Sequence, residues 1–221
     1  MINNSMNIRK RLVGLIYYFK RITIIILALL AVFQVNHVYA YSTIPVYYWY
    51  SNSNNIGHWA FVPTISKINY SSGTSFYFLA GYSHARTQWS QAGISTIDNG
   101  SNSSSNIVCK GGTITELANN SNVTESMLAG KNGVTYYACN MDMLLDYNGS
   151  QKYRYNMSSA TIYIINKGLG IDAQKKTFTH EVGHALGWFG HSAGNTDVMY
   201  AYGSQYLYLT MRDKNHLCQI Y

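Results

Sequence analysis

The spacing of two histidines around one glutamate constrains this chain more than any other feature of its sequence. His180 and His184 enclose Glu181 in the run His-Glu-Val-Gly-His. Residues four apart lie on the same face of an α-helix, so a helix would aim both imidazoles at one ion. At ordinary composition such a run arises by chance in fewer than about one in a hundred chains of this length. We therefore expect a helix that carries a zinc site.

The glutamate and the residues downstream complete this interpretation. Glu181 is offset from His180 by about 100° around the helix, so it reaches past the ion and can act as a general base. Zinc in a reactive site needs a third protein ligand and one open position for water, and His191 is the nearby candidate. The alternative is two exposed histidines and a surface glutamate. Gly187, His191 and Met199 downstream weaken it.

The first forty residues have the composition of an export signal. Five basic residues and no acid precede or flank an apolar run at 22–35, and Val38-Tyr39-Ala40 fits the small-residue rule for cleavage after Ala40. The run is shorter than a membrane span of about 20 residues. We expect residues 1–40 to be a signal peptide and residues 41–221 to be one secreted domain. An uncleaved membrane anchor is the alternative.

Charge argues against a nucleic-acid partner. The chain of 221 residues has a formal charge of +7, with 16 basic and 9 acidic residues. Without residues 1–40, 11 basic residues face the same 9 acidic ones, so the expected mature domain is almost neutral. No basic stripe remains. Apolar residues make up 47 % of the chain, which is enough for a sizeable core.

Hydrophobic periodicity predicts an α+β domain with a mixed sheet. Strand patterns cover four segments: 41–50, 107–110, 134–139 and 160–166. Helix patterns cover 74–92, 172–187 and a last stretch from Thr210 to the C-terminus. Asp172 is the expected N-cap of the second helix, and Gly93 and Gly187 are expected to end the first two helices. Thr210 and Asp213 form an approximate capping box, and residues 98–106 read as a loop.

The remaining histidines and the cysteines give weaker signals. His58, His84 and His216 are isolated in the sequence, so we expect surface or hydrogen-bonded side chains rather than metal ligands. The three cysteines allow three single disulfide pairings and always leave one thiol over. Their spacing matches no zinc-finger pattern. The cysteines are Cys109, Cys139 and Cys218.

The segment 179–200 resembles the metzincins, whose pattern is His-Glu-x-x-His-x-x-Gly-x-x-His followed by a Met-turn. Among them it looks most like the matrixins, because Asp197-Val198-Met199-Tyr200 resembles their Met-turn. A looser resemblance covers most of residues 41–221. It implies a zincin-like catalytic domain: a twisted, mixed five-stranded sheet with an active-site helix and a C-terminal helix.

The resemblance also implies a function. It predicts a secreted, monomeric zinc endopeptidase that acts on a protein or peptide, with metal ligands His180, His184 and His191 and catalytic base Glu181. Residues 134–139 would be the cleft-edge strand that a substrate chain joins. Residues 201–209 would form the wall of the main specificity pocket. Structural calcium is common in the family, but no clear oxygen-ligand loop indicates it here. The resemblance places Cys109 and Cys139 on neighbouring strands, so we expect them to form the disulfide.

The chain departs from the family pattern at two points. The family's third histidine falls on Gly190, whereas His191 is one residue late. Counting back from Met199, however, His191 has the matrixin interval, so the mismatch is confined to residues 188–190. One extra residue costs a loop little, and glycine gives the backbone freedom for a detour. The second departure is that we find no propeptide with a blocking cysteine.

Two rival functions follow from the same residues. A non-catalytic, zinc-stabilised surface or adhesion protein could keep this fold, although it would have no need for Glu181. A membrane-anchored peptidase would retain residues 1–40.

Overall fold

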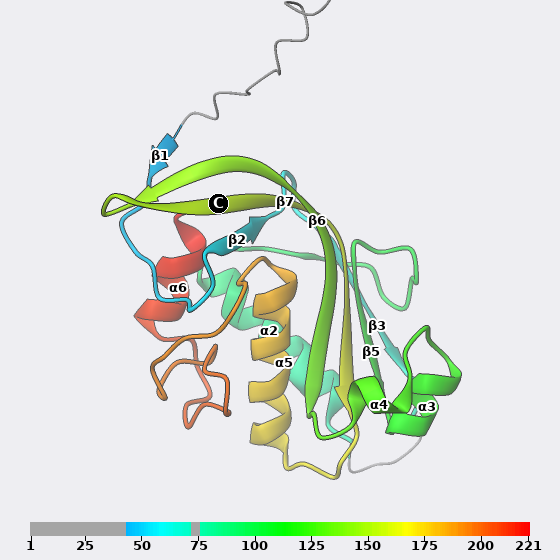
Figure 1. Ribbon diagram of the computed structural model, residues 1–221. Coiled ribbons are helices and arrows are strands. Elements are labelled where there is room, and N and C mark those ends of the chain that lie inside the picture. Colours follow the sequence, from blue (N-terminus) through cyan, green and yellow to red (C-terminus); the bar gives the residue numbers. More distant parts are fainter. Residues whose placement is uncertain (1–42, 72–75) are drawn as a thin grey trace, which may run out of the picture. The chain divides into compact units, whose positions relative to one another are not determined.

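The computed structural model describes residues 43–71 and 76–221, so the expected signal peptide lies outside the described residues. The described residues form an α+β structure whose mixed sheet has seven strands (Figure 1). The strands are β1 Thr43–Pro45, β2 Asn55–His58, β3 Thr64–Asn69, β4 Ile97–Asp98, β5 Ile107–Gly112, β6 Gly133–Tyr147 and β7 Ser150–Ile165. Their order is β1-β6-β7-β5-β3-β4, with β2 beside β7.

The hairpin of β6 and β7 explains why the predicted number of five strands is wrong. Asn148 and Gly149 both have positive φ, 52° and 77°, as a tight Asn-Gly hairpin turn requires. The two strands are antiparallel, and register shifts near Cys139 and Met141 mark where β6 is irregular. Beyond these points the hairpin continues far enough to pair in parallel with β1 and β2, and the sequence pattern missed β2.

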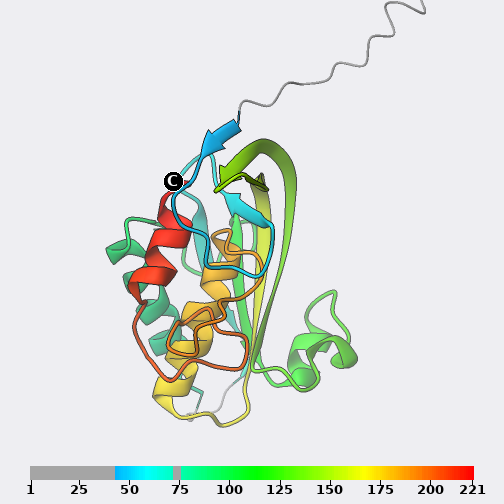
Figure 2. The same cartoon turned by 60° about the vertical axis from the view of Figure 1, so that its left-hand side comes forward.

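Five helices cover the two faces of the sheet within the described residues. They are α2 Phe78–Gln91, α3 Ile114–Asn119, α4 Glu125–Leu128, α5 Ile171–Ala185 and α6 Met211–Cys218. Figure 2 shows α2, α5 and α6 on one side of the sheet and α3 and α4 on the other. No helix in the described ranges has both the length and the apolar character to cross a bilayer.

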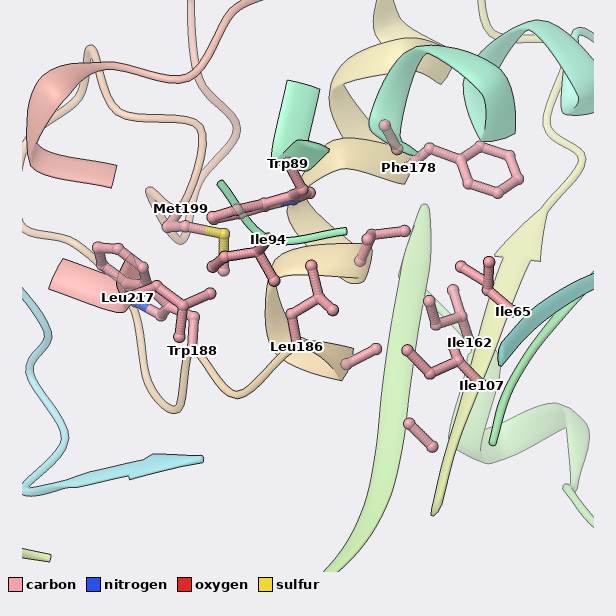
Figure 3. Packing of buried hydrophobic residues seen from close by; sticks show 14 of the residues in the cluster. Ile65, Trp89, Ile94, Ile107, Ile162, Phe178, Leu186, Trp188, Met199 and Leu217 are labelled. Atoms are coloured by element: carbon pink, nitrogen blue, oxygen red, sulfur yellow. The ribbon is translucent and has the colours of Figure 1, made fainter. Parts of the chain in front are cut away.

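Alternating side chains of β7 join two apolar clusters. Ile162 and Ile164 point toward α5 and belong to the main core, while Tyr163 and Ile165 point the other way and pack with Leu117 and its neighbours from α3 and α4. In Figure 3, Ile162 lies with Ile65 and Ile107 of the sheet, and the labelled side chains of α2 and α5 lie beyond them. The core thus supports α5 along its length.

The helix predictions hold in position but not at every end. The helix α2 begins at Phe78 rather than Thr74, which lies outside the described residues, and Gly93 follows its end with φ 96°. The N-cap of α5 is Gly170, so Asp172 instead lies in the first turn, where its charge favours the helix dipole. The capping box of Thr210 and Asp213 at the start of α6 is confirmed.

The predicted strand at 41–50 is wrong except at Thr43–Pro45. Its aromatic residues pack on other elements instead of pairing in the sheet. The backbone N–H groups of Tyr47 and Tyr48 both donate to Gln219 Oε1 at 3.0 Å, and the Trp49 ring lies against His216 of α6. The strands predicted at 107–110, 134–139 and 160–166 correspond to β5 and to parts of β6 and β7.

The predicted disulfide between Cys109 and Cys139 is wrong. All three cysteines are free thiols. Cys109 of β5 is the register partner of Ile162 on β7, whereas Cys139 of β6 is the partner of Met157 on the same strand. Since β7 lies between β5 and β6, the two thiols are not on adjacent strands and cannot meet without moving the backbone.

Candidate metal centre and cleft

The helix α5 has one face in the core and one face in a cleft. Phe178, Val182 and Ala185 are fully buried at helical spacing. The opposite stripe lines a cleft of about 890 Å³ and consists of Ala173, Lys176, Thr177, His180, Glu181 and His184. The indole N–H of Trp89 on α2 donates to Thr179 O at 2.9 Å, which ties the two helices together beside the histidines.

Two segments, residues 57–59 and the C-terminal Tyr221, satisfy the carbonyl groups at the end of α5. Trp59 Nε1 donates to Ala185 O at 2.9 Å, the Tyr221 hydroxyl to Leu186 O at 2.5 Å and the Gly57 N–H to Gly187 O at 2.7 Å. The last carbonyls of a helix have no partner within the helix, so these bonds hold its end in place. Gly187 has φ 113° and lies directly against the backbone of Gly57, which explains its position after the helix.

The three histidines predicted as ligands converge. One nitrogen of each of His180, His184 and His191 lies within 4.8 Å of the other two. The Nδ1 atoms of His180 and His184 each lie 2.7 Å from a backbone oxygen, of Val198 and Trp188, and must donate to it. Their Nε2 atoms therefore present lone pairs to each other at 3.0 Å. A cation between them would remove this repulsion, so the donor set fits zinc.

Burial keeps these imidazoles in the neutral form that binds metal. It lowers the pKa of His180, and it lowers the pKa of His184 further because the neighbouring His180 and His191 add their charge. The pKa of His191 falls for the same reasons, burial first and His180 second. A neutral imidazole is the metal-binding state, so the site does not need to lose protons near neutral pH.

His191 reaches the other two histidines because the turn before it contains Gly190. Gly190 has φ 73°, a conformation that other residues rarely adopt. The amide of His191 donates to Asn52 Oδ1 at 2.8 Å, and the amide of Asn52 donates back to His191 O at 3.0 Å. The Ser51 hydroxyl donates to Phe189 O in the same turn. The segment around Ser51 thus cradles the extra residue.

Glu181 lies beside the histidines and is only 6 % exposed. The Thr135 hydroxyl on β6 lies 2.7 Å from its Oε2 atom, which fixes the direction of the carboxylate. Burial raises the pKa of Glu181 to about 7, although the Thr135 hydrogen bond and the charge of Lys131 oppose the rise. The carboxyl group is therefore poised to exchange a proton near neutral pH.

Met199, part of the segment that resembles a Met-turn, packs beneath α5. It is fully buried, and its sulfur lies against Gly183 between the two helical histidines (Figure 3 shows it beside Trp89). Asp213 of α6 holds this turn, because its carboxylate accepts the amides of Val198 at 2.9 Å and Met199 at 3.2 Å. Sequence reasoning identified Asp213 as a cap but missed this second role.

Two walls enclose the rest of the cleft. One wall is the first part of β6, which includes Val134, Thr135 and Tyr137. Among residues 43–71 and 76–221, this part of β6 pairs with β7 alone. Tyr137 stacks on Phe189 with ring centroids 4.3 Å apart. The other wall is residues 200–204, so only the first part of the predicted 201–209 wall lines the cleft.

The isolated histidines lie elsewhere, hydrogen-bonded as expected. His58 Nε2 is 3.0 Å from Asp142, His84 Nε2 is 3.1 Å from Leu207 O, and His216 accepts the Tyr50 amide at 3.2 Å. None belongs to the metal-ligand group found among the described residues.

No protein-family model matches the chain, and no curated protein sequence matches it either.

Proposed function

We propose that this chain is a secreted, zinc-dependent endopeptidase of the matrixin-like metzincin type. His180, His184 and His191 hold the zinc, and Glu181 is the general base. The observation that carries the proposal is the convergence of three imidazole nitrogens within 4.8 Å, beside Glu181 and inside a cleft. Secretion is supported by the composition of residues 1–40.

Each group around the site has a separate role in the proposed hydrolysis of a peptide bond. Zinc, when bound, supplies a Lewis acid that polarises the scissile carbonyl and lowers the pKa of water. Thr135 engages Oε2 of Glu181, so the other carboxylate oxygen is available to take a proton. Glu181 accepts this proton from the attacking water and returns it to the leaving amine. The carbonyl groups of Val198 and Trp188 hold the two helical imidazoles in orientation.

The shape of the cleft supports an extended peptide as the substrate. The first part of β6 offers unpaired backbone groups beside Glu181, and a peptide can join such an edge as an added strand. The cleft extends along α5 from Ala173 to the three histidines.

The decisive variant is Glu181→Gln. It should keep zinc and the fold but lose at least about 10²–10⁴-fold in rate, the usual contribution of acid–base catalysis. Zinc content and peptide cleavage are measured on the same sample. Glu125→Gln on α4 is the matched control, because Glu125 lies outside the cleft lining. A Glu181→Gln rate within about threefold of the parent rate would remove Glu181 from the mechanism.

Chelation separates this function from its rivals. Cleavage of a peptide library by residues 41–221 should stop when a chelator removes zinc and return when zinc is restored. A zinc-stabilised adhesion protein would bind zinc and cleave nothing. Mass spectrometry of the exported protein tests the signal peptide, and residues 1–40 still attached would favour the membrane-anchored alternative.

A further inference from the structure

Two lysines make one end of the cleft positive. Lys176 lies four residues before His180 on the cleft face of α5, and Lys131 lies in the turn that leads into β6. The acid among the cleft-lining residues is Glu181, which is buried and held by Thr135. The lysine ion pairs recorded for the described residues involve Lys67 and Lys175. The charge of Lys131 acts on Glu181, but neither Lys131 nor Lys176 forms a recorded ion pair within the described residues, so both remain available to a substrate carboxylate.

Both lysines lie at the same end, toward the N-terminus of α5. The strand β6 runs alongside α5 in the same direction: Gly133 lies against Thr177 and Glu181, Thr135 bonds to Glu181, and Tyr137 stacks on Phe189 just after the helix. Lys131 precedes the first of these contacts. The opposite end of the cleft has the aromatic stack and His191. The cleft is therefore polarised along its length.

The distance from the metal site sets where on a substrate these charges act. Four residues of α-helix separate Lys176 from His180, about 6 Å along the axis. An extended peptide advances about 3.3 Å per residue, so the lysines lie about two residues from the scissile bond. Antiparallel strand pairs outnumber parallel ones by about two- to threefold. A peptide antiparallel to β6 places its C-terminal, leaving-group side at the lysines.

We infer that Lys131 and Lys176 select substrates with a carboxylate about two residues from the scissile bond on the leaving-group side. This specificity rests on the proposed peptidase function. The carboxylate can come from an Asp or Glu side chain within a longer chain or from the free C-terminus of a short peptide. Opposite charges in a partly exposed groove steer and orient a partner more than they increase its binding affinity.

The test uses peptide pairs that differ only in Glu or Gln at one position, scanned across both sides of the cleaved bond. A second set ends two residues after that bond, with a free or an amidated C-terminus. Cleavage rates are measured with the zinc-loaded parent, and dissociation constants of the same peptides with Glu181→Gln, which binds without turnover. Two partly exposed ion pairs should favour Glu over Gln by about three- to tenfold. The preference should fade in 1 M salt, where the screening length falls to about 3 Å.

Variants assign the effect to the two lysines. Lys131→Glu with Lys176→Glu should reverse the Glu/Gln preference, and each single Lys→Gln change should remove about half of it on a logarithmic scale. Lys175→Gln is the matched control, since Lys175 is the neighbour on α5 that lies beside Asp172 and outside the cleft lining. Cleavage with no Glu/Gln discrimination, or discrimination only on the acyl side, would overturn the inference and leave the peptidase proposal intact. Discrimination in binding without any cleavage would instead refute the peptidase proposal.

Discussion

The candidate metal centre draws on two regions that hold their histidines in different ways. His180 and His184 belong to α5, whose buried face, tied end and contact with Met199 fix both side chains. His191 belongs to a turn whose path depends on Gly190 and on hydrogen bonds to Asn52. The helix supplies two ligands through regular geometry, which tolerates no inserted residue. The turn supplies the third through contacts that can absorb one. A metal site can therefore keep its geometry while its sequence spacing changes, provided that the change falls in the turn.

Removing one ligand from each region is the strongest test of this comparison. His184→Ala and His191→Ala should each lower zinc affinity by more than about 100-fold, because even the loss of a ligand's supporting partner costs about 10–100-fold. Competition with a chromophoric chelator measures both, and His84→Ala serves as the control. If His191→Ala binds zinc as tightly and cleaves as fast as the parent, the turn does not supply a ligand.

Acid should destabilise the folded protein at His216, whose ring packs against Trp188 next to the turn that carries His191. This buried side chain packs against Trp188 with ring centroids 4.1 Å apart, and burial lowers its pKa to about 3. Between the ordinary pKa of histidine near 6.5 and that value, the unfolded chain binds a proton that the folded chain does not. Stability is thus lost as pH falls, by about 2 kcal/mol from His216 between pH 7 and pH 5.

The measurement is the free energy of unfolding of the zinc-free protein at several pH values. His216→Gln should reduce the loss between pH 7 and pH 5 relative to the parent, whereas His84→Gln should not. Equal slopes for the parent and His216→Gln would show that burial of His216 does not govern the acid sensitivity. The comparison of variant with parent cancels the contribution of the other buried histidines.

Gly190→Ala tests the turn without touching a ligand. The new methyl group would meet Ser51, Asn52 and Ser53 while the backbone stays at positive φ. The backbone strain alone costs about 1–2 kcal/mol, and we expect about a tenfold loss of zinc affinity. Gly168→Ala is the matched control, with φ 67° and open space around the added methyl group. Equal zinc affinities of the two variants would mean that the crowding at Gly190 does not matter to the site.

The smallest expected effect comes from Asn52→Ala. It removes the acceptor of the His191 amide, and one such hydrogen bond contributes about 0.5–1.5 kcal/mol. Because Asn52 is exposed, zinc affinity should fall by only about two- to fivefold. Asn54→Ala is the control, since Asn54 binds Lys152 rather than the turn. A loss as large as that of His191→Ala would show that the turn collapses as a unit.

The sequence predicted the helix-borne part of the site better than the part that loops assemble. The positions of His180 and His184 follow from helical periodicity, and the cap of α6 follows from Thr210 and Asp213, all of which are local rules. The cradle of Asn52 around His191 joins residues 139 positions apart. No local pattern encodes such a contact, although Gly190 signalled that the backbone turns there.

The sheet shows the same limit. The hairpin turn at Asn148 and Gly149 was a local signal that the strand patterns alone did not use. The length of β7 is not apparent from residues 150–158, because these residues are mostly polar and do not alternate regularly with apolar ones. The prediction that Cys109 and Cys139 form a disulfide failed because β7 lies between their strands, and strand propensity does not predict the order of strands in a sheet.

Because the first part of β6 pairs with β7 on one side, hydrogen exchange of its amides can reveal whether a peptide occupies the cleft. In an antiparallel pair, the backbone groups of an edge strand point alternately toward the partner and away from it. Along residues 134–138, amides bonded to β7 should exchange with deuterium slowly, while the alternate amides facing the cleft should exchange fast. A peptide that joins this edge would slow the fast set and leave the slow set unchanged. Deuterium exchange could thus follow occupancy of the cleft residue by residue in the inactive Glu181→Gln variant.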